Sequence, residues 1–157
     1  MALFDDHEEG SKSRAVELVE QTLRALGIDP AVARIAADRG AERWSLRRGS
    51  VVMLVAIQAA STEGEAASLR VVAPVVRVGS ADRAVLYAWL LEANAREVRG
   101  AAFGVTGDEV VLIAERSVLD LDASEVDAMV RTVGAAADHY DDFLATKFGA
   151  VRASDRS

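Results

Sequence analysis

The fold is decided by residues 101–149, which read AAFGVTGDEVVLIAERSVLDLDASEVDAMVRTVGAAADHYDDFLATKFG. Two apolar runs, 101–105 and 110–114, flank residues 106–109, where a Gly-Asp pair supplies the backbone conformation of a tight hairpin turn. The segment that follows carries apolar residues at helical spacing from Val126 to Leu144. A hairpin followed by an amphipathic helix favours an antiparallel sheet covered by helices.

Both ends of this last helix are marked in the sequence. Asp122 and Glu125 have the spacing of a capping box, and Leu121 with Val126 has that of a hydrophobic staple. Gly149 is the expected terminator.

Two further helices are predicted upstream. One runs over residues 13–26 and has an apolar stripe at spacings of three and four residues, ending before Gly27. The other runs over residues 81–97, with Ser80 as its N-cap. Because residues 84–91 are apolar all round, this second helix is expected to be wholly buried or to turn half of its surface to a partner.

Strands are predicted between these helices. Residues 42–47 alternate, with Trp44 and Leu46 on one side. Residues 51–57 are apolar at both parities, which indicates a central strand covered on both faces. In the strand over 69–78, Pro74 indicates a sheet edge or a bulge. Residues 61–65 are expected to form a loop, and residues 31–37 suit either a strand or a short helix.

The predicted class is therefore α+β, an antiparallel sheet flanked by helices in the order α-β-β-β(-β)-α-β-β-α. The chain of 157 residues favours one domain, expected over residues 13–149. A flexible acidic tail over 1–12 and a polar tail over 150–157 complete the chain.

Composition excludes several classes of protein. Cysteine is absent and only two histidines occur, which removes thiol nucleophiles, disulfides, thiolate zinc sites and most metal centres. A net charge of −7 disfavours nucleic-acid binding. The longest apolar runs are far short of the roughly 20 residues of a membrane helix, and the acidic N-terminus lacks the features of a signal peptide. We expect a cytoplasmic protein with no cofactor.

Two groups of charged residues are candidate ligand-binding sites. Asp138, Asp141 and Asp142 share one helix face, but no second element converges on them, so we predict a solvated acidic face and no metal site. Arg43 and Arg47 share a strand face where two guanidinium groups could clamp an anion. The alternative is an exposed strand face with ion pairs to nearby acids. Nucleotide-binding loops, nucleophile elbows and zinc-protease motifs are missing, which disfavours an enzyme.

The apolar residues of the strand predicted over 51–57 indicate a function more clearly than the charged groups do. Of the two faces of residues 51–57, one can pack beneath the amphipathic helices and the other needs separate cover. We therefore identify Val52, Met53, Leu54 and Trp89 as the candidate partner or dimer surface. We expect a homodimer, and whether the second sheet face binds a client or forms the dimer is open at this point.

Several loose patterns of apolar positions and turns carry a resemblance to a known family. They lie at 90–94, 100–104, 107–112, 119–122 and 137–142, and the Trp44–Ser50 stretch is compatible with them. The chain resembles the YbjN family, whose domains are similar to class I type III secretion chaperones. The resemblance covers roughly residues 14–149 and implies a helix-strands-helix-hairpin-helix fold, often dimeric, in a bacterial regulator. It implies no catalytic residue.

We therefore expect a non-enzymatic, chaperone-like or regulatory protein that binds a polypeptide partner. The alternative is a small-ligand or anion sensor that uses Arg43 and Arg47.

Overall fold

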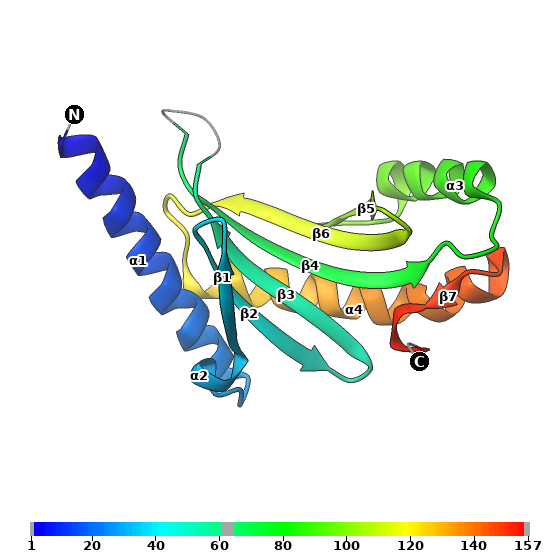
Figure 1. The fold of residues 1–157 in the computed structure, drawn as a ribbon, viewed down its shortest axis with the longest axis horizontal. Helices are drawn as coiled ribbons and strands as arrows, with labels where there is room; N and C mark the ends of the chain where they lie inside the picture. Colours follow the sequence, from blue (N-terminus) through cyan, green and yellow to red (C-terminus); the bar gives the residue numbers. More distant parts are fainter. Residues whose placement is uncertain (1, 61–64, 156–157) are drawn as a thin grey trace. The chain divides into compact units, whose positions relative to one another are not determined.

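The computed structural model describes residues 2–60 and 65–155, so most of the loop expected over 61–65 lies outside the described residues. The elements in chain order are α1 (Ala2–Ala25), α2 (Pro30–Ala33), β1 (Arg34–Asp38), β2 (Ala41–Arg48), β3 (Val51–Gln58), β4 (Ser68–Arg77), α3 (Arg83–Arg96), β5 (Ala102–Thr106), β6 (Glu109–Ser117), α4 (Ala123–Phe148), β7 (Val151–Arg152) and a 3-10 turn, η1 (Ala153–Asp155). The antiparallel sheet has the order β1-β2-β3-β4-β6-β5, and β7 pairs with β4 (Figure 1). The α+β prediction is confirmed.

The chain divides into two compact units. Unit 1 comprises residues 1–46, 54–71 and 115–130, and unit 2 comprises residues 47–53, 72–114 and 131–157. Strands β2, β3, β4 and β6 and helix α4 contribute residues to both units. The single domain over 13–149 stays a prediction.

Unit 1 is organised around α1. Val19 and Leu23 of the predicted stripe are buried, together with Ala15. Residues 2–12, expected to be a flexible tail, instead continue this helix. One contact at this end of the helix is a hydrogen bond of 2.9 Å from Lys12 Nζ to the carbonyl of Gly40.

Residues 31–37 contain both a helix and a strand. Pro30 begins the single turn of α2, and Asp29 caps it by accepting a hydrogen bond of 2.9 Å from the Ala31 N–H. The chain then becomes extended and forms β1, which pairs antiparallel with β2 and is exposed along its whole length. The alanines fit both conformations. The Asp29 cap and Pro30 therefore determine where the helix forms, and the pairing with β2 determines where the strand forms.

The strand β2 alternates as predicted, with Trp44 and Leu46 buried and Arg47 exposed. In β3 the alternation corrects the prediction of a strand covered on both faces. The odd-numbered residues 51, 53, 55 and 57 are buried. On the even-numbered face Val52 is 43% exposed and Leu54 is half-buried, whereas Ala56 is buried. One face of β3 is therefore core and the other is partly open.

Pro74 does not mark a sheet edge, because β4 lies between β3 and β6. The expectation of an edge strand is wrong. Pro74 lines a pocket together with residues 50–52 at the start of β3 and with Ala153 and Ser154 of η1. The ladder between β4 and β7 begins beyond Pro74, at Val76 and Arg77.

In unit 2, α3 begins two residues later than predicted. Its N-cap is Asp82, whose carboxylate accepts hydrogen bonds from the N–H groups of Ala84 (3.0 Å) and Val85 (3.2 Å). Ser80 is not the cap because the carboxylate of Asp82, two residues closer to the helix, satisfies these groups. The helix buries Leu86, Leu90 and Ala93 and lies along β5 (Figure 1).

The hairpin and the last helix are confirmed. Thr106 pairs with Glu109 across a turn in which Gly107 has φ of 60°. At the start of α4, Asp122 accepts from the Glu125 N–H (2.9 Å), and the Asp122 N–H donates to the Glu125 carboxylate (3.1 Å). This reciprocal pair is the predicted capping box.

Residues 151–155, expected within a polar tail, form β7 and η1. Val151 and Arg152 pair with β4, and the Arg152 guanidinium donates to Asp142 (2.7 Å) and to both oxygens of Asp155 (2.9 and 3.0 Å). Backbone pairing together with charged hydrogen bonds orders this segment.

Candidate functional site

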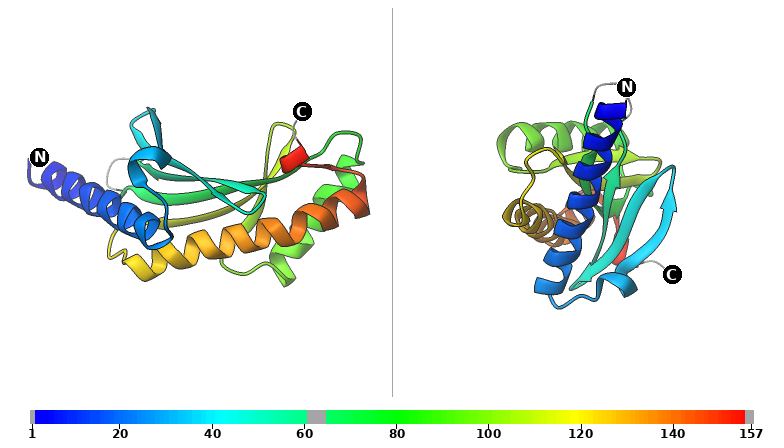
Figure 2. Two further views of the ribbon diagram at one scale, coloured as in Figure 1. Left: turned by 90° about the horizontal axis from the view of Figure 1, so that it is seen from below. Right: turned by 90° about the vertical axis from the view of Figure 1, so that its left-hand side faces the viewer.

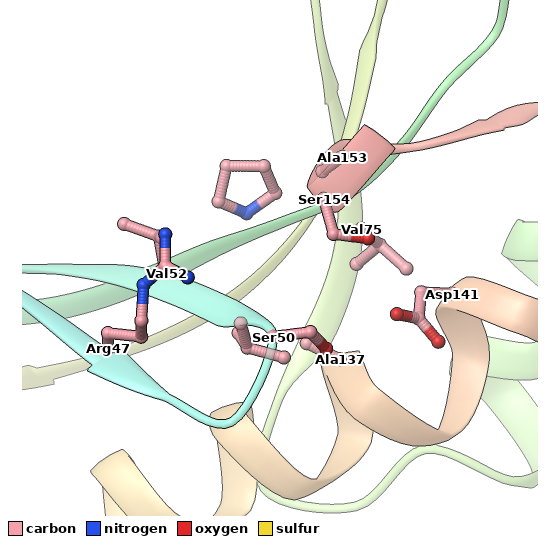
Figure 3. A pocket seen from close by; sticks show the side chains of 10 residues that line it. Arg47, Ser50, Val52, Val75, Ala137, Asp141, Ala153 and Ser154 are labelled. Atoms are coloured by element: carbon pink, nitrogen blue, oxygen red, sulfur yellow. The ribbon is translucent and has the colours of Figure 1, made fainter. Parts of the chain in front are cut away.

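Unit 2 contains a cavity of about 520 Å³, which we call the Arg47 pocket (Figure 3). Its lining comes from the end of β2, the start of β3 and the turn between them, from β4, from α4 and from η1. The residues are Arg47, Ser50, Val51, Val52, Pro74, Val75, Ala137, Asp141, Ala153 and Ser154. Its volume lies within the range of small-molecule sites, about 300–1,000 Å³.

Two opposite charges stand at this pocket. Arg47 and Asp141 lie on opposite sides of it in Figure 3. Arg47 has no ion pair or hydrogen bond to any side chain among residues 9–60 and 65–155. Its guanidinium is therefore available to a ligand.

Asp141 is in an environment that disfavours its charge. Burial raises the pKa of Asp141, and the charges of Asp142 and Asp138 raise it further, while the Asp142 N–H and Arg152 oppose the rise. The Asp142 N–H donates to Asp141 Oδ1 at 2.6 Å. Arg152 does not pair with Asp141 because Asp142 and Asp155 occupy its guanidinium.

Unit 1 contains a second cavity of about 380 Å³, which we call the β3 hollow. It is lined by Asp38, Arg39, Ala41, Arg43, Leu54, Ala56, Gln58 and Ala59, so it lies on the outward parity of β3. Arg43 forms an ion pair with Asp38 (3.4 Å) and donates to the Ala36 carbonyl (3.0 Å).

The predicted clamp of Arg43 and Arg47 is not assembled in one cavity. Arg43 lines the β3 hollow and is paired, whereas Arg47 lines the Arg47 pocket and is unpaired. Shared parity puts two side chains on one strand face, but residues four apart on a strand are separated by about 13 Å. Each arginine therefore has its own surroundings.

The structure separates the four residues of the predicted partner surface. Val52 and Leu54 lie on the outward face of β3. Met53 is buried, and its Cε and Sδ would lie 3.3 Å from a Cβ placed on Gly134 of α4. Met53 therefore belongs to the core of unit 2.

Trp89 is half-buried at the centre of an aromatic cluster that the sequence analysis did not identify. Its ring centroid lies 5.1 Å from Phe143, 5.8 Å from Phe148, 6.0 Å from Tyr140 and 6.2 Å from Phe103. The Lys147 ammonium lies 5.6 Å from the Trp89 ring centroid. The cluster joins α3 to the C-terminal half of α4, where the two helices cross (Figure 2, left). The available signal was the spacing of Tyr140, Phe143 and Phe148 on one helix.

The Asn94 side chain is a second feature that sequence reasoning missed. From α3 it donates to the Phe103 carbonyl (3.1 Å) and accepts from the Phe103 N–H (2.7 Å). Phe103 is on β5, at the end of the sheet order, so the amide acts as a short piece of neighbouring strand.

Asp138, Asp141 and Asp142 do not form a metal-binding group. Within residues 9–60 and 65–155, whose side chains the structure describes, no three His, Asp or Glu side chains are arranged to hold a metal ion. Asp142 is paired with Arg152 instead.

No helix in the described part of the chain combines the length and apolar character needed to span a membrane.

The chain belongs to the YbjN family. The family model, described as "Putative bacterial sensory transduction regulator", matches residues 15–146. No curated protein sequence matches this one.

Solved structures share the fold at low sequence identity. A chain of the ExsC–ExsE complex has a TM-score of 0.64 and 19% identity, with 85% of this chain and 95% of that chain covered. A chain of the HopA1–SchA chaperone–effector complex has a TM-score of 0.54 and 10% identity, with coverage of 80% and 91%. A chain of the ExoT–SpcS complex from Pseudomonas aeruginosa has a TM-score of 0.52 and 16% identity, with coverage of 80% and 95%. The fold of this chain is therefore similar to that of a chain in each of these three complexes.

Proposed function

We propose that this protein is a non-enzymatic, chaperone-like regulator that binds a polypeptide partner on the outward face of β3. The observation that carries the proposal is the open hollow over Leu54, on a strand whose other face is fully buried. Exposed apolar surface on a sheet is typical of protein-binding sites. The similarity in fold to a chain of the HopA1–SchA chaperone–effector complex supports the same class of function.

Three glutamate substitutions test this surface. Leu54→Glu should leave the protein folded and remove captured partner proteins, because it places a charge on the binding face. Val32→Glu is the matched control, since Val32 is an exposed apolar residue on α2 in the same unit. Met53→Glu should unfold the protein because Met53 is buried.

The measurements are circular dichroism, sedimentation equilibrium and pull-down from the native host with identification of the bound proteins. A Leu54→Glu variant that stays folded but keeps every partner retained by the Val32→Glu variant contradicts the proposal. A variant that becomes monomeric assigns the face to a dimer interface instead.

We further propose that the protein is a homodimer that associates through α3. The exposed residues Ala84, Ala88, Leu91 and Ala95 follow one another at spacings of four, three and four, and Val85 lies beside them. Leu91 is 70% exposed and Val85 is 56% exposed. Two copies that covered such stripes would need to bury at least about 1,000 Å² for a stable interface.

Sedimentation equilibrium tests this proposal. We expect twice the chain mass of 16.7 kDa for the wild type and for Ala135→Glu, an exposed control on α4, and a single chain mass for Leu91→Glu. A wild-type monomer at tens of micromolar contradicts it.

A second candidate function, the sensing of a small ligand, is favoured by the unpaired Arg47 guanidinium in its pocket. Cytoplasmic localisation and the lack of nucleic-acid binding stay predictions from the acidic sequence.

A further inference from the structure

The Arg47 pocket holds one positive and one negative side chain, and neither is neutralised by the other. Ion pairs elsewhere in unit 2 are made at short distances, such as Arg83 with Asp108 at 2.5 Å. Arg47 has no such partner among the described side chains. Asp141 forms no ion pair with any described side chain: it accepts the N–H of the next residue, and the charge of Arg152, which is paired with Asp142 and Asp155, acts on it without direct contact. The pocket therefore presents two separate, unmet charges.

The surface between these charges is largely apolar. Val52, Pro74, Val75 and Ala137 contribute to the lining, and the hydroxyls of Ser50 and Ser154 add two neutral hydrogen-bonding groups (Figure 3). A simple anion would be attracted by Arg47 but repelled by Asp141. A simple amine would be attracted by Asp141 but repelled by Arg47. A molecule with both charges and an apolar body satisfies the whole lining.

We propose that the Arg47 pocket binds a dipolar molecule of the amino-acid class, with its carboxylate on Arg47, its ammonium on Asp141 and its apolar side chain on Val52 and Val75. A guanidinium binds a carboxylate through two parallel hydrogen bonds, which fixes the orientation. The ammonium of the ligand would also stabilise Asp141 in its charged form, which burial alone disfavours. All the lining residues belong to unit 2, so the site is complete within that unit.

This inference deepens the second candidate function and is independent of the polypeptide-binding proposal. Free amino acids and short peptides share the required chemistry, and the experiment distinguishes them. Isothermal titration calorimetry on the purified full chain, with no partner present, uses leucine, leucyl-leucine, N-acetyl-leucyl-leucine and leucyl-leucine amide. The acetyl group removes the ammonium charge, and the amide removes the carboxylate.

The expected result is sub-millimolar binding of leucine or leucyl-leucine, with both blocked dipeptides at least about tenfold weaker than leucyl-leucine, since each loses one charged hydrogen-bonding group. Binding of leucine identifies the free amino acid as sufficient, and binding of leucyl-leucine alone identifies a peptide.

Two conservative variants complete the test. Arg47→Gln should weaken the binding of the free and the acetylated dipeptide, which carry a carboxylate, but not the binding of the amide. Asp141→Asn should weaken the binding of the free dipeptide and the amide, which carry an ammonium, but not the binding of the acetylated form. Arg43→Gln is the matched control, because Arg43 lies on the same strand and lines the other hollow. Circular dichroism checks that each variant is folded.

Three outcomes overturn the inference: no ligand binds the wild type, the blocked dipeptides bind as tightly as the free one, or the two variants do not show the crossed pattern. Each leaves the pull-down test of the β3 face unaffected.

Discussion

Replacing Asn94 with alanine should destabilise the junction between α3 and β5. The substitution removes two hydrogen bonds to the backbone of Phe103, at 3.1 and 2.7 Å, each contributing about 1 kcal/mol. Alanine returns about 0.6 kcal/mol through its higher helix propensity. The net loss is about 1.4 kcal/mol, which corresponds to a fall in Tm of about 3–6 °C for a chain of this size.

Thermal unfolding followed by circular dichroism measures this change. Glu92→Ala, an exposed substitution on the same helix, controls for helix propensity. Asn94→Asp sharpens the test, because it retains the acceptor but directs a carboxylate at the Phe103 carbonyl. Its Tm deficit relative to wild type should shrink from pH 7 to pH 4, as the carboxyl gains a proton that it can donate. A Tm for Asn94→Ala equal to or above that of the wild type would refute the reasoning.

Three other outcomes are expected. The pKa of Asp122 is lowered by hydrogen bonds from Ser124 and the Glu125 N–H, so its stabilisation is present above the unfolded pKa and is lost as pH falls through the folded value. The Tm difference between wild type and Asp122→Ala should therefore shrink from pH 6 to pH 2.5, and a constant difference contradicts this. Gly100 has φ of 71°, and an added Cβ would lie 3.3 Å from Thr132 Cγ2, so Gly100→Ala should cost at least about 1 kcal/mol in urea unfolding; an unchanged midpoint counts against it. Calorimetry with calcium, magnesium, manganese and zinc should show nothing tighter than about millimolar, and a micromolar site lost in Asp141→Asn would overturn that expectation.

The sequence by itself determined the elements whose signals are local. The hairpin around Gly107 and the capping box of Asp122 and Glu125 depend on residues within a few positions of one another. The alternation of β2 could also be predicted, because successive side chains of a strand point to opposite faces regardless of what packs against the strand. These elements and the family resemblance were sufficient for the α+β class.

The N-cap of α3 and the conformation of residues 31–37 depended on which of several neighbouring residues made the better local interaction. Asp82 caps α3 in place of Ser80, and the alanines of 31–37 divide between α2 and β1. Pro74 lies in a central strand because β4 is placed between β3 and β6, and β7, formed from residues expected in a tail, pairs with β4 just beyond it. A strand of two residues is too short to produce a periodic pattern in the sequence, so β7 could not be predicted.

Only the tertiary structure decided which face of β3 is open, and which arginine is free. The run of residues 51–57 is apolar at both parities, so the sequence alone could not orient it, and Met53 is core while Leu54 lines a hollow. Arg43 and Arg47 are equivalent by spacing, yet Asp38 neutralises one and nothing among the described side chains neutralises the other. The physical reason is that burial and charge pairing depend on residues distant in the chain, which fold topology brings together and sequence periodicity does not encode.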